Sequence, residues 1–334
     1  MDRRADYILR RLRLRHLELL VTLAEAGTMR AAAERLHLSQ PAISKMLAEA
    51  EDALEARLFE RSRQGVQATA AGGAAVRRAR VVLGELAHVR DEVSAIRQGA
   101  SAVLRVGTFS VTQAVPAAVV ALRRKVPGVA VHLHEARVHE LVQRLLEGEL
   151  DCVFGALTHD LLDSDLLRRV QSEVLLEDRL CGLVADAHPG LPGLPNLRRR
   201  GLRWVDLRGA AWVAPPRRTL VRQAFMAAFL DEGVDPPEPV IEAMSSVTIG
   251  AVLRLDPTLV CAVRHEHARD EVARGGVRLL ALQPEVPLPP LRLFTRRSGQ
   301  ETSPVVREFA QAIRGAGAGG AGAVTKRLQG QRRR

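Results

Sequence analysis

Apolar residues in the first third of the chain recur every three or four positions, which is the spacing of one face of a helix. They predict an amphipathic helix over residues 13–26 that ends at Gly27, a residue that tolerates the left-handed backbone of a helix C-terminus. The apolar positions on which this prediction rests are Leu14, Leu17, Val21 and Ala24.

Two further helices are expected to follow, separated by a tight turn. The hydroxyl of Thr28 is expected to cap the first of them, over about residues 29–36, and Ser39 to cap the second. Pro41 stands just inside the second helix, where its missing N–H costs nothing. The pattern predicts a helix-turn-helix, although the same pattern also occurs in helical hairpins of ordinary all-α proteins.

The second of these helices presents small and polar side chains outward, among them Gln40 and Ser44. Glutamine can make two hydrogen bonds to adenine, while serine and lysine can meet a base edge or a phosphate. A short basic hairpin follows and is expected to act as a wing whose arginines reach phosphate or the minor groove. The predicted DNA contacts are therefore Thr28, Ser39, Gln40, Pro41, Ser44, Lys45, Arg61 and Arg63.

Residues 73–98 contain no proline, and their apolar positions alternate at spacings of four and three. This heptad pattern is typical of two helices that pair, and a single long helix lying on its own domain is the alternative. A paired helix would place two recognition helices about one turn of DNA apart, which demands a near-palindromic site. The residues expected at the centre of the pairing surface are Val82, Leu86, Val89, Val93 and Ile96.

From residue 103 the pattern changes to short apolar strands that alternate with helices. Over residues 103–155 the order strand, helix, strand, helix, strand predicts a parallel sheet of doubly wound type. A second, similar unit occupies residues 179–263, and a late strand at 291–295 and a helix at 303–314 complete the pattern. The last twenty residues are rich in glycine and alanine, end in three arginines, and are expected to be disordered.

Composition narrows the classes of protein. A chain of 334 residues is long enough for two or three domains. It has no apolar run that would span a bilayer and no recognisable export signal, and its three cysteines are far apart; we therefore expect a cytoplasmic protein without a disulfide framework. The net charge of +11 favours a polyanionic partner only weakly, because residues 1–65 hold 12 Lys and Arg against 10 Asp and Glu.

An enzyme is the main alternative to a DNA-binding protein. His132 and His134 share one face of a predicted strand, and residues 265–267 read His-Glu-His, but neither group has the spacing of a metal site. The chain has no GxSxG, no P-loop and no GxGxxG after a strand, and no nucleophile with its base can be assembled. We expect neither catalysis nor a metal nor a cofactor. The alternative is a cytosolic small-molecule-binding or catalytic α/β protein with a vestigial helix-turn-helix.

Several stretches resemble the DNA-binding domain of the LysR-type transcriptional regulators. The matching residues are Ala32-Ala33, Leu36, Ser39-Gln40-Pro41-Ala42, Ser44, Leu58-Phe59-Glu60-Arg61 and Thr69-Ala70-Ala71-Gly72. The chain departs from the family pattern at Ala50-Glu51 and Leu54-Glu55, where Leu-Glu and Leu-Gly are usual, and at Leu255-Asp256-Pro257-Thr258, where Gly-x-Gly is frequent. A weaker similarity, in residues 16–21 and 39–47, is to a subgroup that includes regulators of sugar-uptake and aromatic-acid genes.

The resemblance implies the organisation of the whole chain. A winged helix-turn-helix would occupy residues 1–72, a linker and dimerisation helix residues 73–100, and an α/β effector domain like the periplasmic binding proteins the remainder. In that domain, lobe I would comprise residues 101–173 and 286–314 and lobe II residues 174–285, with the disordered basic tail at 315–334. A homodimer or homotetramer would bind an interrupted palindrome of double-stranded DNA and contact RNA polymerase.

The family also places a small-molecule effector between the two lobes, here a sugar or an aromatic or organic acid. Ligands of open α/β sheets bind at the carboxyl ends of the strands, where helix N-termini supply N–H donors. Helix capping is an equally good explanation for any one hydroxyl at these ends. The residues expected to bind the effector are Thr108, Phe109, Ser110, Thr158, Val213, Ala214, Pro216, Ser246 and Thr248.

Overall fold

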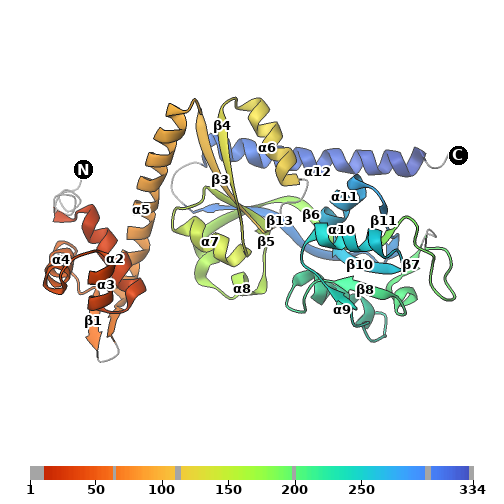
Figure 1. The fold of residues 1–334 in the computed structure, drawn as a ribbon, viewed down its shortest axis with the longest axis horizontal. Helices are drawn as coiled ribbons and strands as arrows, with labels where there is room; N and C mark the ends of the chain where they lie inside the picture. The colour runs from red at the N-terminus through yellow and green to blue at the C-terminus, as the bar shows by residue number, and fades with distance from the viewer. Residues whose placement is uncertain (1–10, 63–64, 110–113, 198–200, 298–301, 331–334) are drawn as a thin grey trace. The chain divides into compact units, whose positions relative to one another are not determined.

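The structure is a computed structural model that describes residues 11–62, 65–109, 114–197, 201–297 and 302–330, with side chains omitted at 246 and from 318 onward. The chain divides into two compact units, Met1–Val103 with Gln143–Asp151, and Leu104–Val142 with Cys152–Arg334. Figure 1 shows both. None of the described helices is both long and apolar enough to cross a membrane.

The described part of the first unit is a helical domain with a two-stranded hairpin and a long helix. Its elements are α2 (Leu14–Ala26), α3 (Met29–Arg35), α4 (Gln40–Ala53), β1 (Phe59–Ser62), β2 (Gly65–Ala68) and α5 (Ala70–Arg97). The predicted caps are present, because the hydroxyl of Thr28 accepts from the N–H of Ala31 and that of Ser39 from the N–H of Ala42. Gly27 adopts the left-handed conformation expected at the end of α2, with φ of 68°.

The buried face of α2 differs from the predicted one. His16, Leu19, Leu20 and Leu23 are buried, whereas Leu14 and Ala24 are exposed. Apolar residues follow both faces of this helix, so their spacing alone does not fix its orientation. His16 lies on the buried face, where its Nδ1 accepts from the N–H of Arg13 and its Nε2 lies 3.2 Å from Oε2 of Glu49 on α4.

The second unit is built on one mixed sheet with the strand order β4-β3-β5-β13-β6-β10-β8-β9, and β11 also pairs with β6. Its first elements are β3 (Ala102–Thr108), α6 (Ala114–Lys125), β4 (Val129–Glu135), α7 (Val138–Leu146), β5 (Cys152–Ala156), α8 (His159–Leu162), a 3-10 turn (Asp165–Arg169) and β6 (Val170–Ala185). The next are β7 (Leu202–Arg203), a 3-10 turn (Trp204–Leu207), β8 (Ala211–Ala214), α9 (Leu220–Leu230), β9 (Ile241–Glu242), α10 (Ser246–Leu255) and β10 (Leu259–Arg264). The last are α11 (His265–Arg274), β11 (Val277–Leu279), β12 (Leu282–Gln283), β13 (Val286–Arg296) and α12 (Pro304–Gly330).

The sheet contains antiparallel pairs in addition to the parallel strands that the sequence predicted. β3 pairs with β5, and β10 with β8, in parallel, but β6 and β13 run antiparallel to each other and to their neighbours β10 and β5. These two strands are also long, and the chain crosses along them between two halves of the sheet. We call the half with β3–β5 and α6–α8 lobe I, and the half with β7–β12 and α9–α11 lobe II. The predicted crossings near 173 and 285 fall inside β6 and just before β13.

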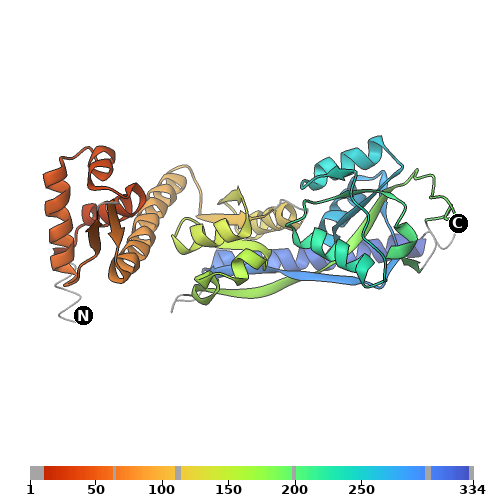
Figure 2. The same ribbon diagram turned by 90° about the horizontal axis from the view of Figure 1, so that it is seen from below.

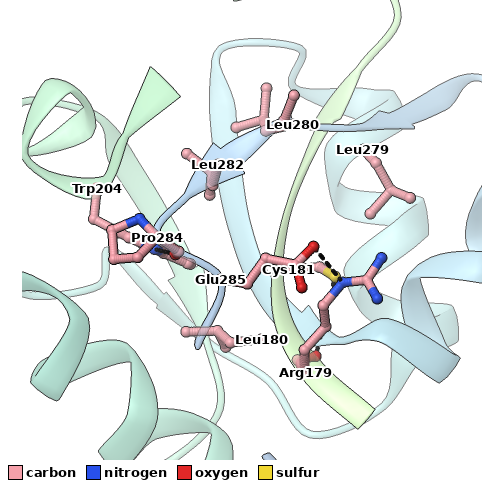
Figure 3. Close-up of a pocket in the computed structure, with 10 residues that line it drawn as sticks. Arg179, Leu180, Cys181, Trp204, Leu279, Leu280, Leu282, Pro284 and Glu285 are labelled. Atoms are coloured by element: carbon pink, nitrogen blue, oxygen red, sulfur yellow. Dashed lines mark hydrogen bonds and ion pairs between the residues drawn. The ribbon is translucent and has the colours of Figure 1, made fainter. Parts of the chain in front are cut away.

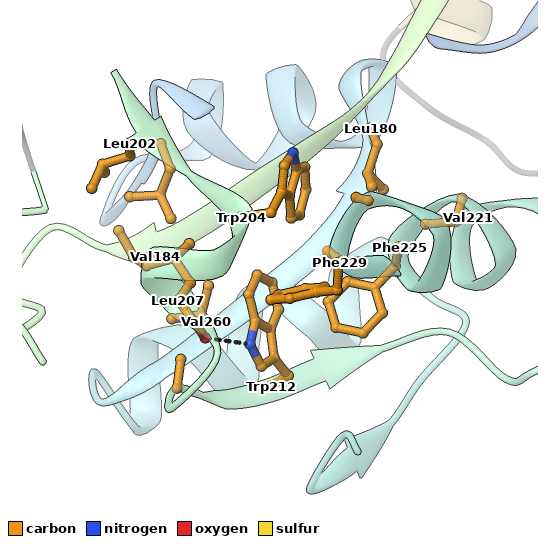
Figure 4. Close-up of a cluster of buried hydrophobic side chains, with 14 of the residues drawn as sticks. Leu180, Val184, Leu202, Trp204, Leu207, Trp212, Val221, Phe225, Phe229 and Val260 are labelled. Carbon is orange, nitrogen blue, oxygen red and sulfur yellow. Dashed lines mark hydrogen bonds between the residues drawn. The ribbon is translucent and has the colours of Figure 1, made fainter. Parts of the chain in front are cut away.

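Aromatic side chains form the centre of lobe II. Trp204, Trp212, Phe225 and Phe229 are fully buried together, with ring centroids between 4.8 and 6.2 Å apart (Figure 4). The two indole N–H groups are satisfied, one by the carbonyl of Leu207 and the other by the carbonyl of Pro284. Since aromatic residues are only 3% of the chain, this cluster concentrates the packing in lobe II.

The last helix is longer than predicted. A helix was expected over residues 303–314 with a disordered tail from 315, but α12 continues through that segment to Gly330. At the start of this added segment the guanidinium of Arg269 donates to the carbonyls of Ala316 and Gly317, a contact that no sequence pattern reveals. Figures 1 and 2 show α12 running beside elements of both lobes.

The turn after α4 contains a strained residue that offers a test of the local geometry. Glu55, which departs from the Leu-Gly usual in the family that the sequence resembles, has a φ of 50°. This left-handed conformation costs a residue with a Cβ about 1–2 kcal/mol of stability. We therefore expect Glu55→Gly to stabilise the first unit by about 1 kcal/mol. Hydrogen exchange of the α2–α4 amides in the full chain would measure the gain. Glu55→Ala is the control, because it keeps the Cβ; an equal gain in both variants would contradict the strain.

Candidate nucleic-acid interface and ligand cleft

The exposed face of α4 is the one that the sequence indicated. Gln40, Pro41 and Lys45 are exposed and Ser44 is half-buried, while Ile43 and Leu47 point into the core. Ser39 and Thr28 are exposed at the N-termini of α4 and α3, with their hydroxyls already used as caps. The face therefore offers one amide, one hydroxyl and one cation to a partner, a set that suits the edges of DNA bases.

The wing brings a second cation to this face. A guanidinium nitrogen of Arg61, on β1, lies 3.3 Å from the hydroxyl oxygen of Ser44 on α4. The two predicted contact residues are 17 positions apart in the chain, and the structure places them side by side. Arg63, the other predicted wing residue, lies outside the described residues.

Close backbone contacts dock the wing on the helices. The N–H of Val66 donates to the carbonyl of Gly27 at 2.7 Å. A Cβ on Gly65 would lie 2.3 Å from that same carbonyl oxygen, and φ at Gly65 is 121°, so only glycine fits. The position of the wing is thus set by the turn between α2 and α3.

A second set of close contacts joins the start of the wing to α4 and α5. It involves Glu51, Thr69 and Gly72, which belong to the family pattern but had no predicted role. Oε1 of Glu51 accepts from the N–H groups of Leu58 and Phe59, at 2.7 and 3.2 Å. Thr69 donates its hydroxyl to the carbonyl of Arg57 and accepts from the N–H of Gly72. A Cβ on Gly72 would lie 1.8 Å from the carbonyl oxygen of Leu58. The motif containing Thr69 and Gly72 therefore attaches α5 to the start of the wing.

The predicted pairing residues of α5 lie together on one exposed face. Val82, Leu86, Val89, Val93 and Ile96 are between 42% and 56% exposed, although each is a large apolar side chain. A helix face of this kind is unfavourable in water and is typical of a surface that a partner covers.

Lobe I and lobe II meet at the carboxyl end of β3. Thr108 is fully buried there, and the ring of Phe109 stacks on the imidazole of His267 from lobe II with 6.3 Å between centroids. The guanidinium of Arg264, also from lobe II, lies 5.5 Å from the centroid of Phe109. Phe109, one of the predicted ligand residues, is thereby brought against lobe II, while Ser110 lies outside the described residues.

A buried ion pair stands at the same junction and was not predicted. Nε of Arg264, at the end of β10, lies 2.5 Å from Oδ2 of Asp178 on β6, and both side chains are at most 5% exposed. The guanidinium also donates to the carbonyl of Pro289 on β13, and the N–H of His265 donates to Asp178. One arginine thus ties lobe II to both crossing strands. The residues are 86 positions apart, so the sequence carried no signal of this pair.

The histidines beside this pair are neutral near pH 7. Burial, together with the nearby charge of Arg264, lowers the pKa of His267 to about 4. Burial likewise lowers the pKa of His265 to about 4. In the described part of the chain, no group of three or more His, Cys, Asp and Glu side chains is placed to hold a metal ion.

Among the predicted ligand residues, Thr158 has a buried hydroxyl that lacks a hydrogen bond in the described structure. It occupies the N-cap position of α8 but makes no capping bond, and its Oγ1 is buried without a hydrogen-bond partner among the described residues. The next residue, His159, lies with Nε2 3.0 Å from Oε1 of Gln223 in lobe II. The hydroxyl therefore lies next to a contact between the lobes.

The remaining predicted residues are less informative. Val213 and Ala214 are buried in β8, so they offer a ligand little beyond their backbone, and Pro216 is half-buried. Thr248 is exposed on α10, and Ser246 is the first residue of that helix.

The described cavities lie elsewhere. One of about 130 Å³ is walled by side chains around β6 and β12, with Arg179 and Glu285 paired at 3.7 Å on its rim (Figure 3). It is smaller than the roughly 300–1,000 Å³ of ordinary ligand pockets. Burial raises the pKa of Cys181, which lines it, to about 12, so that thiol is unreactive. An open groove of about 490 Å³ runs between β13 and α12. Neither contains a predicted ligand residue.

Comparison with known proteins agrees with this arrangement. The model of the bacterial regulatory helix-turn-helix proteins of the lysR family matches residues 14–73, and that of the LysR substrate binding domain matches residues 97–318. The HTH-type transcriptional regulator GbpR of Azospirillum brasilense is 31% identical over 310 residues, which cover 87% of this chain and 88% of that protein. The DNA-binding transcriptional dual regulator OxyR of Escherichia coli (strain K12) is 33% identical over 183 residues, covering 52% of this chain and 60% of OxyR.

Solved structures show the same fold. CbnR, a LysR family transcriptional regulator, superposes with a TM-score of 0.54 at 23% identity, covering 92% of this chain and 99% of CbnR. Full-length OxyR from Pseudomonas aeruginosa gives a TM-score of 0.57 at 23% identity, covering 90% and 97%. The match of both family models, and of GbpR over most of both chains, confirms the resemblance predicted from the motifs. The chain therefore belongs to the LysR family of DNA-binding transcriptional regulators, with an N-terminal helix-turn-helix and a C-terminal effector-binding domain.

Proposed function

We propose that this regulator reads a specific DNA site with the outer face of α4 and with Arg61 of the wing. The observation that supports this most directly is the contact between Arg61 and Ser44, which joins wing and helix into one surface. Paired through α5, two copies would read an interrupted palindrome, and two dimers would form a tetramer. CbnR has been solved in complex with its target DNA, and this chain shares its fold.

We propose further that a small molecule, a sugar or an aromatic or organic acid, binds between the lobes and changes the angle between them. The unpartnered hydroxyl of Thr158 and the stacked pair of Phe109 and His267 support this position. The effector acts only through its different affinity for the two lobe arrangements. The protein would work in the cytoplasm, where it contacts RNA polymerase, and would catalyse no reaction; its relatives are regulators.

Sequencing of genomic DNA fragments captured by the tagged protein tests the recognition surface. The wild-type chain should recover sites that share one dyad. Gln40→Ala should relax the preference at one base pair by about 1–3 kcal/mol, because it removes hydrogen bonds to a base. Arg61→Ala should weaken binding to all sequences more evenly. Unchanged affinity and preference in Gln40→Ala would place the recognition helix elsewhere.

Pairing through α5 can be tested with one charge placed on or off the exposed apolar face. Val93→Glu should separate the dimer in sedimentation velocity and weaken binding to a two-half-site DNA, because a carboxylate cannot be buried unpaired between two helices. Ser94→Glu adds the same charge to an exposed neighbouring position and should leave the dimer intact. Dimers of equal stability in both variants would rule out this face as the pairing surface.

The hydroxyl of Thr158 can be tested by thermal unfolding before any effector is identified. Thr158→Val should leave the melting temperature unchanged or raise it, since a buried group without a partner is replaced by a methyl of the same shape. Thr219→Val should lower stability by about 1 kcal/mol, because that hydroxyl caps α9 at 3.2 Å from the N–H of Arg222. A comparable loss in Thr158→Val would show that the hydroxyl has a structural partner. With the effector in hand, Thr158→Val should keep DNA affinity and blunt the response.

A further inference from the structure

The first half of α12 belongs to lobe I. Its buried residues follow helical spacing, and they are Val306, Phe309, Ala310 and Ile313. Nζ of Lys125, at the end of α6, lies 2.5 Å from Oε2 of Glu308 and 3.4 Å from Oε1 of Gln311. These contacts fix the helix on α6 as far as about residue 313.

Beyond that point α12 continues across the crossing strand β6. Arg314 forms an ion pair with Glu173, a residue of β6. One turn further, Gly317 stands where a Cβ would lie 2.1 Å from Cδ2 of Leu176, so the absence of a side chain lets the helix approach the strand closely. Gly317 lies four residues after Ile313 and extends the same inner face.

The helix then reaches lobe II. The two terminal nitrogens of Arg269, on α11, donate to the carbonyls of Gly317 and Ala316 at 3.4 and 3.3 Å. The side chain of Arg269 is only 14% exposed and lies 3.5 Å from Oε2 of Glu266, which holds it in place. A residue of lobe II is thereby bound to a helix that is anchored on lobe I. Figure 1 shows α12 continuing from lobe I towards lobe II.

We propose that α12 beyond Arg314 is a splint that holds the two lobes at one angle. A rotation of lobe II about β6 and β13 moves Arg269 away from the two carbonyls, so the splint opposes it. The contact is weak enough to break, because it consists of two hydrogen bonds to main-chain oxygens and one close approach. The splint would therefore set how readily the lobes rotate, whatever molecule the cleft binds.

Double electron–electron resonance spectroscopy can follow the angle between the lobes, because it measures the distance between two spin labels on the full-length protein. Leu162→Cys in lobe I and Leu230→Cys in lobe II are suitable positions, since both leucines are more than half exposed. The three native cysteines are buried and should not react. An excess of unlabelled copies keeps labels in different chains from contributing. The same labels are placed in a chain that ends after Arg314, in Arg269→Gln, and in a chain that ends after Gly330.

In the complete chain the distance distribution should be narrow. Ending the chain after Arg314 should broaden it by about twofold or shift its centre, and Arg269→Gln should change it in the same direction, because rotation about the crossing strands is no longer opposed. The chain ending after Gly330 lacks only the last four residues and should match the complete chain. An unchanged distribution in both the shorter chain and Arg269→Gln would overturn the splint, as would equal broadening in the chain that ends after Gly330. Retained DNA binding in every variant checks that each is folded.

Discussion

The buried pair of Arg264 and Asp178 is the interaction on which the arrangement of the effector-binding domain depends. Two charges removed from water are stable only when each is compensated, and loss of one partner from such a pair costs about 3–5 kcal/mol. Here the carboxylate receives the guanidinium and the N–H of His265, while the guanidinium also reaches the carbonyl of Pro289. The pair therefore constrains the end of β10 against both strands along which the chain crosses between the lobes.

The same arginine connects this constraint to the region where a ligand is proposed to bind. Its guanidinium lies over the ring of Phe109, which follows the first strand of lobe I and stacks on His267. Because burial keeps His267 neutral, the stack adds no further charge beside the ion pair. A molecule entering between the lobes would have to displace or accommodate the ring of Phe109. The position of that ring thus depends on the position of lobe II, because Arg264 and His267 of lobe II contact it directly.

The DNA-binding unit is organised by a different kind of interaction. Main-chain groups place the wing: the carbonyl of Gly27 receives the N–H of Val66, and Glu51 receives the N–H groups of Leu58 and Phe59. Such contacts depend on close approach, which Gly65 and Gly72 permit because neither has a Cβ. The family motifs of this unit therefore describe two contacts of the backbone, whereas Gln40, the residue proposed to read a base, is an exposed side chain of α4. Glu55 shows that one departure from the family pattern is tolerated at the expense of a strained backbone.

Local features of the sequence determined much of the first unit. Caps at Thr28 and Ser39, the glycine at residue 27 and the helical spacing of α5 act within a few residues, and the structure has the caps, the helix end and the long helix where they were predicted. The inner face of α2 was not determined in this way, because apolar residues follow two sides of the helix and a histidine pairs with α4. The alternation of strands and helices likewise indicated an α/β domain but not the direction of β6 and β13, which is decided by where the chain crosses between the lobes.

Only the tertiary structure decided the contacts between distant segments. The ion pair of Asp178 and Arg264, the stack of Phe109 on His267 and the attachment of Arg269 to the carbonyls of α12 each join residues more than forty positions apart. Nothing in the spacing of these residues marks them as partners, since each is an ordinary residue in its own element. The sequence by itself therefore determined which helices form in the described part of the first unit and which face of α4 is exposed. The angle between the lobes and the contact of the last helix with lobe II follow from packing, because their energy comes from groups that meet only when the sheet has formed.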